Sequence, residues 1–80
     1  MQKEYILYGT SACHLCEEAE VIMSIVLQNH DILYMKKDIV DDEYLLRQYA
    51  LTIPVLKSVA TQTELNWPFT EDAVEAFIRQ

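Results

Sequence analysis

The first half of the chain constrains the fold most, because a short apolar run, a helical pattern and a second apolar run follow one another closely. Residues 4–8 and 32–35 are predicted to be strands, and residues 13–28 carry the helical pattern. The apolar positions of that helix are Leu15, Ala19, Ile22, Met23, Val26 and Leu27. A strand, a helix and a strand joined this tightly predict a βαβ unit with parallel strands and a right-handed crossover.

The second half predicts a short helix, a hairpin and a final helix. Asp41 or Asp42 can cap a helix that runs to about Tyr49, with Tyr44, Leu45 and Tyr49 on its apolar side. Residues 55–56 and 63–67 are predicted to pair as a hairpin across a polar turn. Thr70 can cap a last helix whose apolar stripe is Val74, Phe77 and Ile78. The element order is βαβ, α, ββα, which indicates an α/β fold.

Length and charge restrict the kinds of partner. With 80 residues and 51% apolar side chains, we expect one domain over residues 1–80. A formal charge of −7 disfavours nucleic acid and anionic membranes as partners. No apolar run approaches the roughly 18 residues of a membrane span, and the first residues lack the apolar core of a signal peptide. Two cysteines are too few for a secreted disulfide scaffold, so we expect thiol chemistry in the cytoplasm.

Cys13-His14-Leu15-Cys16 is the motif with the most specific chemical content, because it falls at the predicted start of the first helix. There the sulfur of Cys13 faces unpaired backbone N–H groups and the positive end of the helix dipole, which favour the reactive thiolate. Cys16, one turn further, should be the more buried thiol. Dithiol exchange follows, in which Cys13 attacks a disulfide and Cys16 resolves the mixed disulfide. Glu17 and Glu18 oppose thiolate formation at Cys13.

Other interpretations of the cysteine pair remain open. The pair is either redox-active, inert, or part of a metal or cluster site shared between two chains. His14 and His30 lie at opposite ends of one predicted helix, roughly 24 Å apart at about 1.5 Å per residue, which excludes a four-ligand site within one chain. His14 either tunes the Cys13 thiolate or is a simple surface residue.

Pro54 opens a short strand directly after Thr52-Ile53, and this placement predicts that it lies beside the helix start that carries the thiols. A cis bond between Ile53 and Pro54 is a hypothesis.

The segment from Tyr8 to Cys16, followed by Thr52-Ile53-Pro54-Val55-Leu56, resembles the glutaredoxin-like branch of the thioredoxin superfamily. The likeness is greatest to small, poorly characterised bacterial members and covers essentially the whole chain. It implies a thioredoxin-like fold with a four-stranded mixed sheet flanked by three helices, with Cys13 as nucleophile and Cys16 as resolving thiol. It also implies a cis Pro54, with the backbone of Ile53 available to an extended substrate. Substrate contacts are expected from Ile53 and Pro54, and also from Thr10 and His14 beside the cysteines.

Two departures from that family concern glutathione. Glutathione-using members carry a lysine where this chain has Thr10, and a paired-glycine turn where it has Trp67-Pro68-Phe69-Thr70. A cation and a close backbone approach to the two carboxylates of glutathione are thereby removed, so we expect weak glutathione binding. The segment Trp67-Pro68-Phe69 also resembles the corresponding segment of the poorly characterised branch. Alternatively, its two aromatic residues are ordinary core residues.

The sequence thus predicts a cytoplasmic thiol-disulfide oxidoreductase without a bound cofactor or metal, which acts on protein or small-molecule disulfides. The alternative is a non-catalytic binding module or redox sensor that docks a partner peptide beside Pro54.

Overall fold

The computed structural model describes residues 4–80, which form one four-stranded sheet and three α-helices. In chain order the elements are β1 (Tyr5–Gly9), α1 (His14–Leu27), β2 (Tyr34–Asp38), η1 (Ile39–Asp41), α2 (Glu43–Tyr49), β3 (Val55–Ser58), β4 (Glu64–Asn66) and α3 (Glu71–Ile78), where η1 is a 3-10 helix. The strand order is β2-β1-β3-β4; β1 and β2 are parallel, and the other pairs are antiparallel. The expected mixed sheet and three helices are confirmed.

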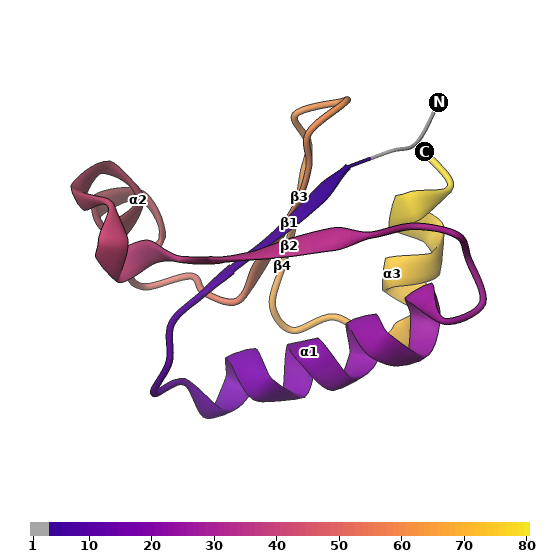
Figure 1. Ribbon diagram of the computed structural model, residues 1–80, viewed down its shortest axis with the longest axis horizontal. Coiled ribbons are helices and arrows are strands. Elements are labelled where there is room, and N and C mark those ends of the chain that lie inside the picture. The colour runs from indigo at the N-terminus through magenta and orange to yellow at the C-terminus, as the bar shows by residue number, and fades with distance from the viewer. Residues whose placement is uncertain (1–3) are drawn as a thin grey trace.

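The alternation of side chains along β1 divides the core between the two faces of the sheet. Tyr5 and Leu7 belong to the larger buried cluster, which includes residues of α1 and α3. Tyr8 belongs to the smaller cluster, against which Ile6 and residues of α2 pack. Figure 1 shows α1 below the strands and α3 at the right beside the end of α1, with α2 well away from both at the left. Both faces of β1 are therefore packed, as the apolar run at residues 4–8 predicts.

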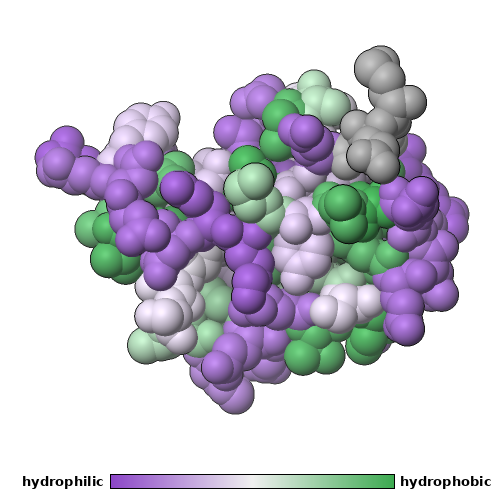
Figure 2. All heavy atoms as spheres, in the orientation of Figure 1, coloured by the Kyte–Doolittle hydropathy of each residue, from purple (hydrophilic) through white to green (hydrophobic). Residues whose placement is uncertain are grey.

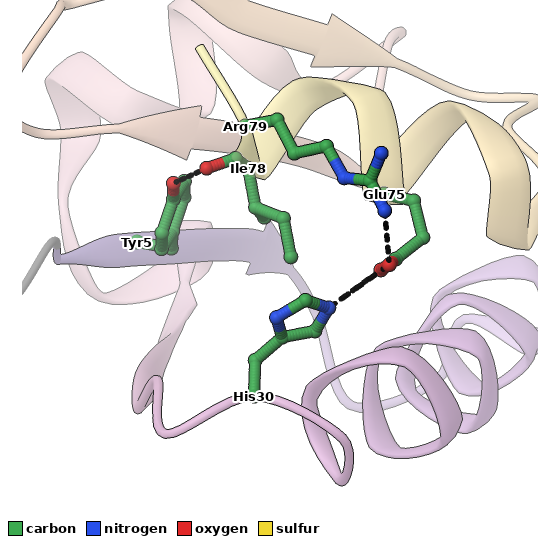
Figure 3. Close-up of polar contacts among 5 residues, drawn as sticks. All are labelled: Tyr5, His30, Glu75, Ile78 and Arg79. Atoms are coloured by element: carbon green, nitrogen blue, oxygen red, sulfur yellow. Dashed lines mark hydrogen bonds and ion pairs between the residues drawn. The ribbon is translucent and has the colours of Figure 1, made fainter.

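Polar contacts join the end of α1 to α3 (Figure 3). Nε2 of His30 lies 2.7 Å from Oε2 of Glu75, and Nη2 of Arg79 lies 3.6 Å from Oε1 of Glu75. At the start of β1, the hydroxyl of Tyr5 donates to the carbonyl of Ile78 at 3.3 Å. These contacts connect the βαβ unit to the C-terminal helix.

Three predicted details are wrong. The second strand is Tyr34–Asp38 rather than residues 32–35, because its pairing with β1 runs from Tyr5 opposite Tyr34 to Gly9 opposite Asp38. As an edge strand it leaves Lys36 in contact with solvent. Leu15 is 44% exposed, because the buried stripe of α1 starts at Cys16. Tyr44 is 67% exposed, because α2 turns other residues toward the sheet.

On the face shown in Figure 2, hydrophilic residues separate the apolar surface into several small patches. Within residues 4–80, no helix has the length and apolar character needed to cross a membrane.

Candidate active site

Cys13 is the N-cap residue of α1. β1 ends at Gly9, the chain turns through residues 10–12, and the helix begins at His14. The backbone of Cys13 is extended, and its Sγ accepts a hydrogen bond from the backbone N–H of Cys16 at 3.1 Å. The predicted placement of this sulfur at the helix start is confirmed, and there the helix stabilises negative charge.

Cys13 and Cys16 form a disulfide, with their Cα atoms 5.2 Å apart. Cys16 is buried at 3% exposure, whereas Cys13 is partly exposed. The predicted difference in burial between the two sulfurs is confirmed. An incoming reactant therefore meets Cys13 first.

Gly9 permits the close approach of α1 to the end of β1. A Cβ atom built at this position would lie 3.0 Å from Sγ of Cys16 and 3.3 Å from its Cβ. Contacts this short are tighter than packed side chains normally make, so a larger residue would displace Cys16. This role of Gly9 could not be predicted from the sequence, because it depends on a neighbour that only the fold brings close.

The peptide bond between Ile53 and Pro54 is cis, as predicted, and so is the bond between Trp67 and Pro68, which was not predicted. Pro54 immediately precedes β3, whose first residue Val55 pairs with Tyr8 of β1. The buried Pro54 therefore lies at the same end of the strands as Gly9, from which the chain continues to Cys13.

Tyr49, the last residue of α2, holds the segment before Pro54. Its carbonyl accepts hydrogen bonds from the backbone N–H groups of Thr52 at 3.0 Å and Ile53 at 3.1 Å. The resemblance implied that the backbone of Ile53 is available to a substrate, but this N–H is already engaged.

The side chain of Tyr49 connects α2 to the sheet. Its ring stacks on Tyr8 with centroids 4.5 Å apart, and its hydroxyl donates to Glu64 of β4. Burial, and then the hydrogen bond to the Glu64 carboxylate, raise the pKa of Tyr49 far above its usual value. The pKa of Tyr8 is also raised, mainly by burial. These contacts fix the segment before Pro54 against the sheet.

The expected substrate contacts His14 and Thr10 have different surroundings. His14 is highly exposed, with its ring nitrogens 3.7 Å from Glu17 and 3.6 Å from Glu18. Thr10 lines a cavity of about 170 Å³ together with Cys16. The structure therefore brings Thr10 close to the disulfide and directs His14 toward acidic neighbours.

Charged side chains that the sequence did not predict for the site line the same cavity. It lies between the start of α1, the turn at residues 9–11 and the end of β2, and it is also lined by Glu20, Lys36, Lys37 and Asp38. Nζ of Lys36 donates to Oε1 of Glu20 at 3.0 Å, and this contact raises the pKa of Lys36. In the sequence, Glu20 follows Cys16 by four residues, and this helical spacing indicates that the two side chains lie on the same side of α1.

The Trp67-Pro68-Phe69 segment packs as core rather than forming an open turn. Phe69 is buried at 5% exposure, and Trp67 meets it edge to face with centroids 5.0 Å apart. Core packing by these two aromatic residues, the alternative role considered from the sequence, is confirmed.

Comparisons with known proteins agree with this architecture. The family described as "Glutaredoxin-like domain (DUF836)" matches residues 4–79. Among curated proteins, no relative matches. A structural genomics target protein from X. campestris is similar in structure, with a TM-score of 0.82, 29% identity, and coverage of 94% of this chain and 95% of the other.

A protein from Nitrosomonas europaea has a TM-score of 0.80 and 27% identity, and the match covers 96% of this chain and 92% of that protein. Thioredoxin 1 from Thermosipho africanus has a TM-score of 0.67 at 13% identity, with coverage of 95% and 94%, which shows the shared fold. The Cys13–Cys16 pair lies at the start of α1 in this fold and indicates a thioredoxin-like redox function. The chain therefore belongs to the glutaredoxin-like domain family, and its fold is thioredoxin-like.

Proposed function

We propose that the protein is a thiol-disulfide oxidoreductase of the cytoplasm. The observation that carries the proposal is the contrast between the two sulfurs: Cys13 caps α1 and is accessible, whereas Cys16 is buried one turn later. In the reduced protein, the Cys13 thiolate attacks one sulfur of a substrate disulfide and releases the other as a thiolate. Cys16 then attacks Cys13, which forms the Cys13–Cys16 disulfide and releases the second substrate thiolate. Two electrons pass from the dithiol to the substrate.

Reduction of insulin disulfides by dithiothreitol tests this activity. The wild-type protein should accelerate the reaction over dithiothreitol alone, and Cys13→Ser should abolish the acceleration. Cys16→Ser should retain the first attack and accumulate a mixed disulfide, detectable by mass spectrometry. A protein that accelerates no disulfide reduction, yet binds the same partner with and without Cys13→Ser, would instead be a binding module that docks a peptide beside Pro54.

The substrate is proposed to lie in extended form beside Ile53 and Pro54, with Thr10 and His14 as further contacts. Since the N–H of Ile53 donates to Tyr49, the proposed pairing uses the carbonyl of Ile53. Because His14 is proposed to contact the substrate, His14→Ala should change KM for a protein disulfide more than it changes the alkylation rate of Cys13. An equal change in both would indicate that His14 acts on the thiolate itself.

Glutathione is proposed to be a poor reductant. Thr10 supplies no cation, and the packed Trp67 and Phe69 occupy the segment where the family's glycines allow backbone contact. Each loss should cost on the order of 1–3 kcal/mol of charge-assisted hydrogen bonding, or roughly tenfold to a hundredfold in affinity. Titration calorimetry with an inert S-alkyl glutathione should show no saturation at millimolar concentrations. Saturable binding in that range would contradict the proposal.

A further inference from the structure

Residues 50–53 join α2 to Pro54 and have little packing of their own. Leu51 is 99% exposed and Thr52 is also exposed, whereas Ile53 is half-buried against the smaller of the two buried clusters. The arrangement of this segment therefore depends largely on its hydrogen bonds.

The carbonyl of Tyr49 is the acceptor of those hydrogen bonds. It accepts from the backbone N–H groups of Thr52 at 3.0 Å and Ile53 at 3.1 Å, and from the hydroxyl of Thr52 at 3.3 Å. Three donors thus converge on one oxygen atom. A movement of Tyr49 would therefore displace Ile53 and Pro54, beside which the substrate is proposed to lie.

The side chain of Tyr49 is held by both strands that flank β3. Its ring stacks on the buried Tyr8 of β1, with the ring planes 14° apart, and its hydroxyl donates to the carboxylate of Glu64 on β4. In the strand order, β1 and β4 are the two neighbours of β3, which begins immediately after Pro54. Stacking alone permits the ring to slide, whereas the hydrogen bond at its far end is directional and fixes its position.

Other polar side chains of α2 make contacts that stay within the helix. The hydroxyl of Tyr44 accepts from Gln48 at 3.3 Å, and Arg47 donates to Glu43 at 2.7 Å. Neither contact reaches the sheet or residues 50–53. Tyr49 differs from these residues because it connects the sheet to the segment before the proline.

We propose that Tyr49 is a positioning residue for substrate binding, whose hydrogen bond to Glu64 holds Ile53 and Pro54 in the arrangement that an extended polypeptide disulfide binds. This inference rests on the proposed oxidoreductase function. A segment that is already ordered loses less freedom when the substrate binds, and affinity falls in proportion to the fraction of molecules in which the segment is correctly placed. The contact should favour polypeptide disulfides over small ones, because a small disulfide reacts with Cys13 without lying along the segment.

The experiment compares two disulfides in stopped-flow reactions with the fully reduced protein. One is an extended peptide whose only cysteine is joined through a disulfide to nitrothiobenzoate, and the other is dithiobis(nitrobenzoate), which contains no peptide. In both reactions the Cys13 thiolate attacks one sulfur and forms a mixed disulfide. The original S–S bond breaks, and nitrothiobenzoate leaves with the electron pair as a coloured thiolate.

Tyr49→Phe keeps the stacked ring and removes the hydroxyl. It should lower the second-order rate constant for the peptide about threefold to tenfold, which is the range that one hydrogen bond normally contributes. The rate constant for the small disulfide should remain nearly unchanged. A merely destabilised variant would contain less folded protein, which lowers the amplitude of both reactions rather than the rate constant for the peptide alone.

Variants of Glu64 and Tyr44 provide the matched controls. Glu64→Ala should slow the peptide reaction as much as Tyr49→Phe, and the two changes together should slow it no further, because both remove the same contact. Glu64→Gln keeps an acceptor oxygen and should remain close to the wild type. Tyr44→Phe removes the same hydroxyl from an exposed position of α2 and should change neither reaction.

Amide hydrogen exchange measures the arrangement of the segment without any substrate. The N–H of Ile53 is protected by its bond to Tyr49, so it should exchange about threefold to tenfold faster in Tyr49→Phe. The N–H of Val74, which donates to the carbonyl of Thr70 at 3.0 Å, should exchange at the wild-type rate.

Three results would overturn the role of Tyr49: an unchanged rate constant for the peptide in Tyr49→Phe, equal slowing by Tyr44→Phe, or equal slowing of the small disulfide. Each leaves the oxidoreductase function standing, because the wild-type protein still reacts with both disulfides. A wild-type protein that reacts with both disulfides no faster than free dithiothreitol does would refute the proposed function itself.

Discussion

Gly9→Ala tests the close packing between the end of β1 and the buried sulfur of α1. The added methyl group would lie 3.0 Å from Sγ of Cys16. This sulfur cannot move away easily, because Cys16 is part of α1. Overpacking of this kind costs about 1–3 kcal/mol. Reduced freedom of the unfolded chain offsets about 0.4–1 kcal/mol. We therefore expect a net loss of up to about 2.6 kcal/mol in the free energy of unfolding.

Urea unfolding under dithiothreitol measures this loss without a contribution from the disulfide. The matched background is Cys16→Ala, which removes the sulfur that the new methyl group would meet. In that background, Gly9→Ala should be neutral or stabilising, so the double-mutant cycle should give a coupling energy of about 1 kcal/mol or more. The same destabilisation in both backgrounds would show that the glycine serves the backbone of the strand and not the approach of Cys16.

Three further predictions concern reactivity and stability. Iodoacetamide should alkylate Cys13 well before Cys16, with a titration midpoint below the usual thiol value of about 8.5; earlier labelling of Cys16 would reverse the assigned roles. Thr70→Ala should cost about 1 kcal/mol, because the hydroxyl of Thr70 accepts from the N–H of Ala73 at 3.1 Å, whereas Thr70→Ser should remain close to the wild type in thermal unfolding. Burial raises the pKa of Tyr8 and Tyr34 above 10.0, so the unfolded chain loses these protons before the folded one, and the free energy of unfolding should fall as pH rises above about 10; constant stability from about pH 9 to about pH 11 would contradict this.

Local patterns in the sequence predicted the helices and their caps. Cys13 caps α1, Asp42 caps α2 and Thr70 caps α3, as expected from short polar or thiol side chains placed before an apolar helical pattern. The apolar stripe of α3 was predicted correctly. These features depend on residues close together in the chain, which is why a sequence pattern can predict them.

Features that depend on distant neighbours were missed or misplaced. The bounds of β2 follow from its register with β1, and an edge strand accepts polar residues such as Lys36 and Lys37. The closeness of Gly9 to Cys16 depends on how α1 folds back on β1. The engagement of the Ile53 N–H likewise depends on where α2 ends. In each case the deciding partner lies in another element of the fold.

The unequal burial of the two sulfurs also determines how the site responds to peroxide. Hydrogen peroxide would oxidise the accessible Cys13 thiolate to a sulfenic acid and release hydroxide. Cys16 lies one helical turn away, so its thiol would condense with the sulfenic acid, form the disulfide and release water. This closure competes with further oxidation of Cys13 to the irreversible sulfinic acid. An oxidised chain therefore remains recoverable by any reductant that can open the Cys13–Cys16 bond.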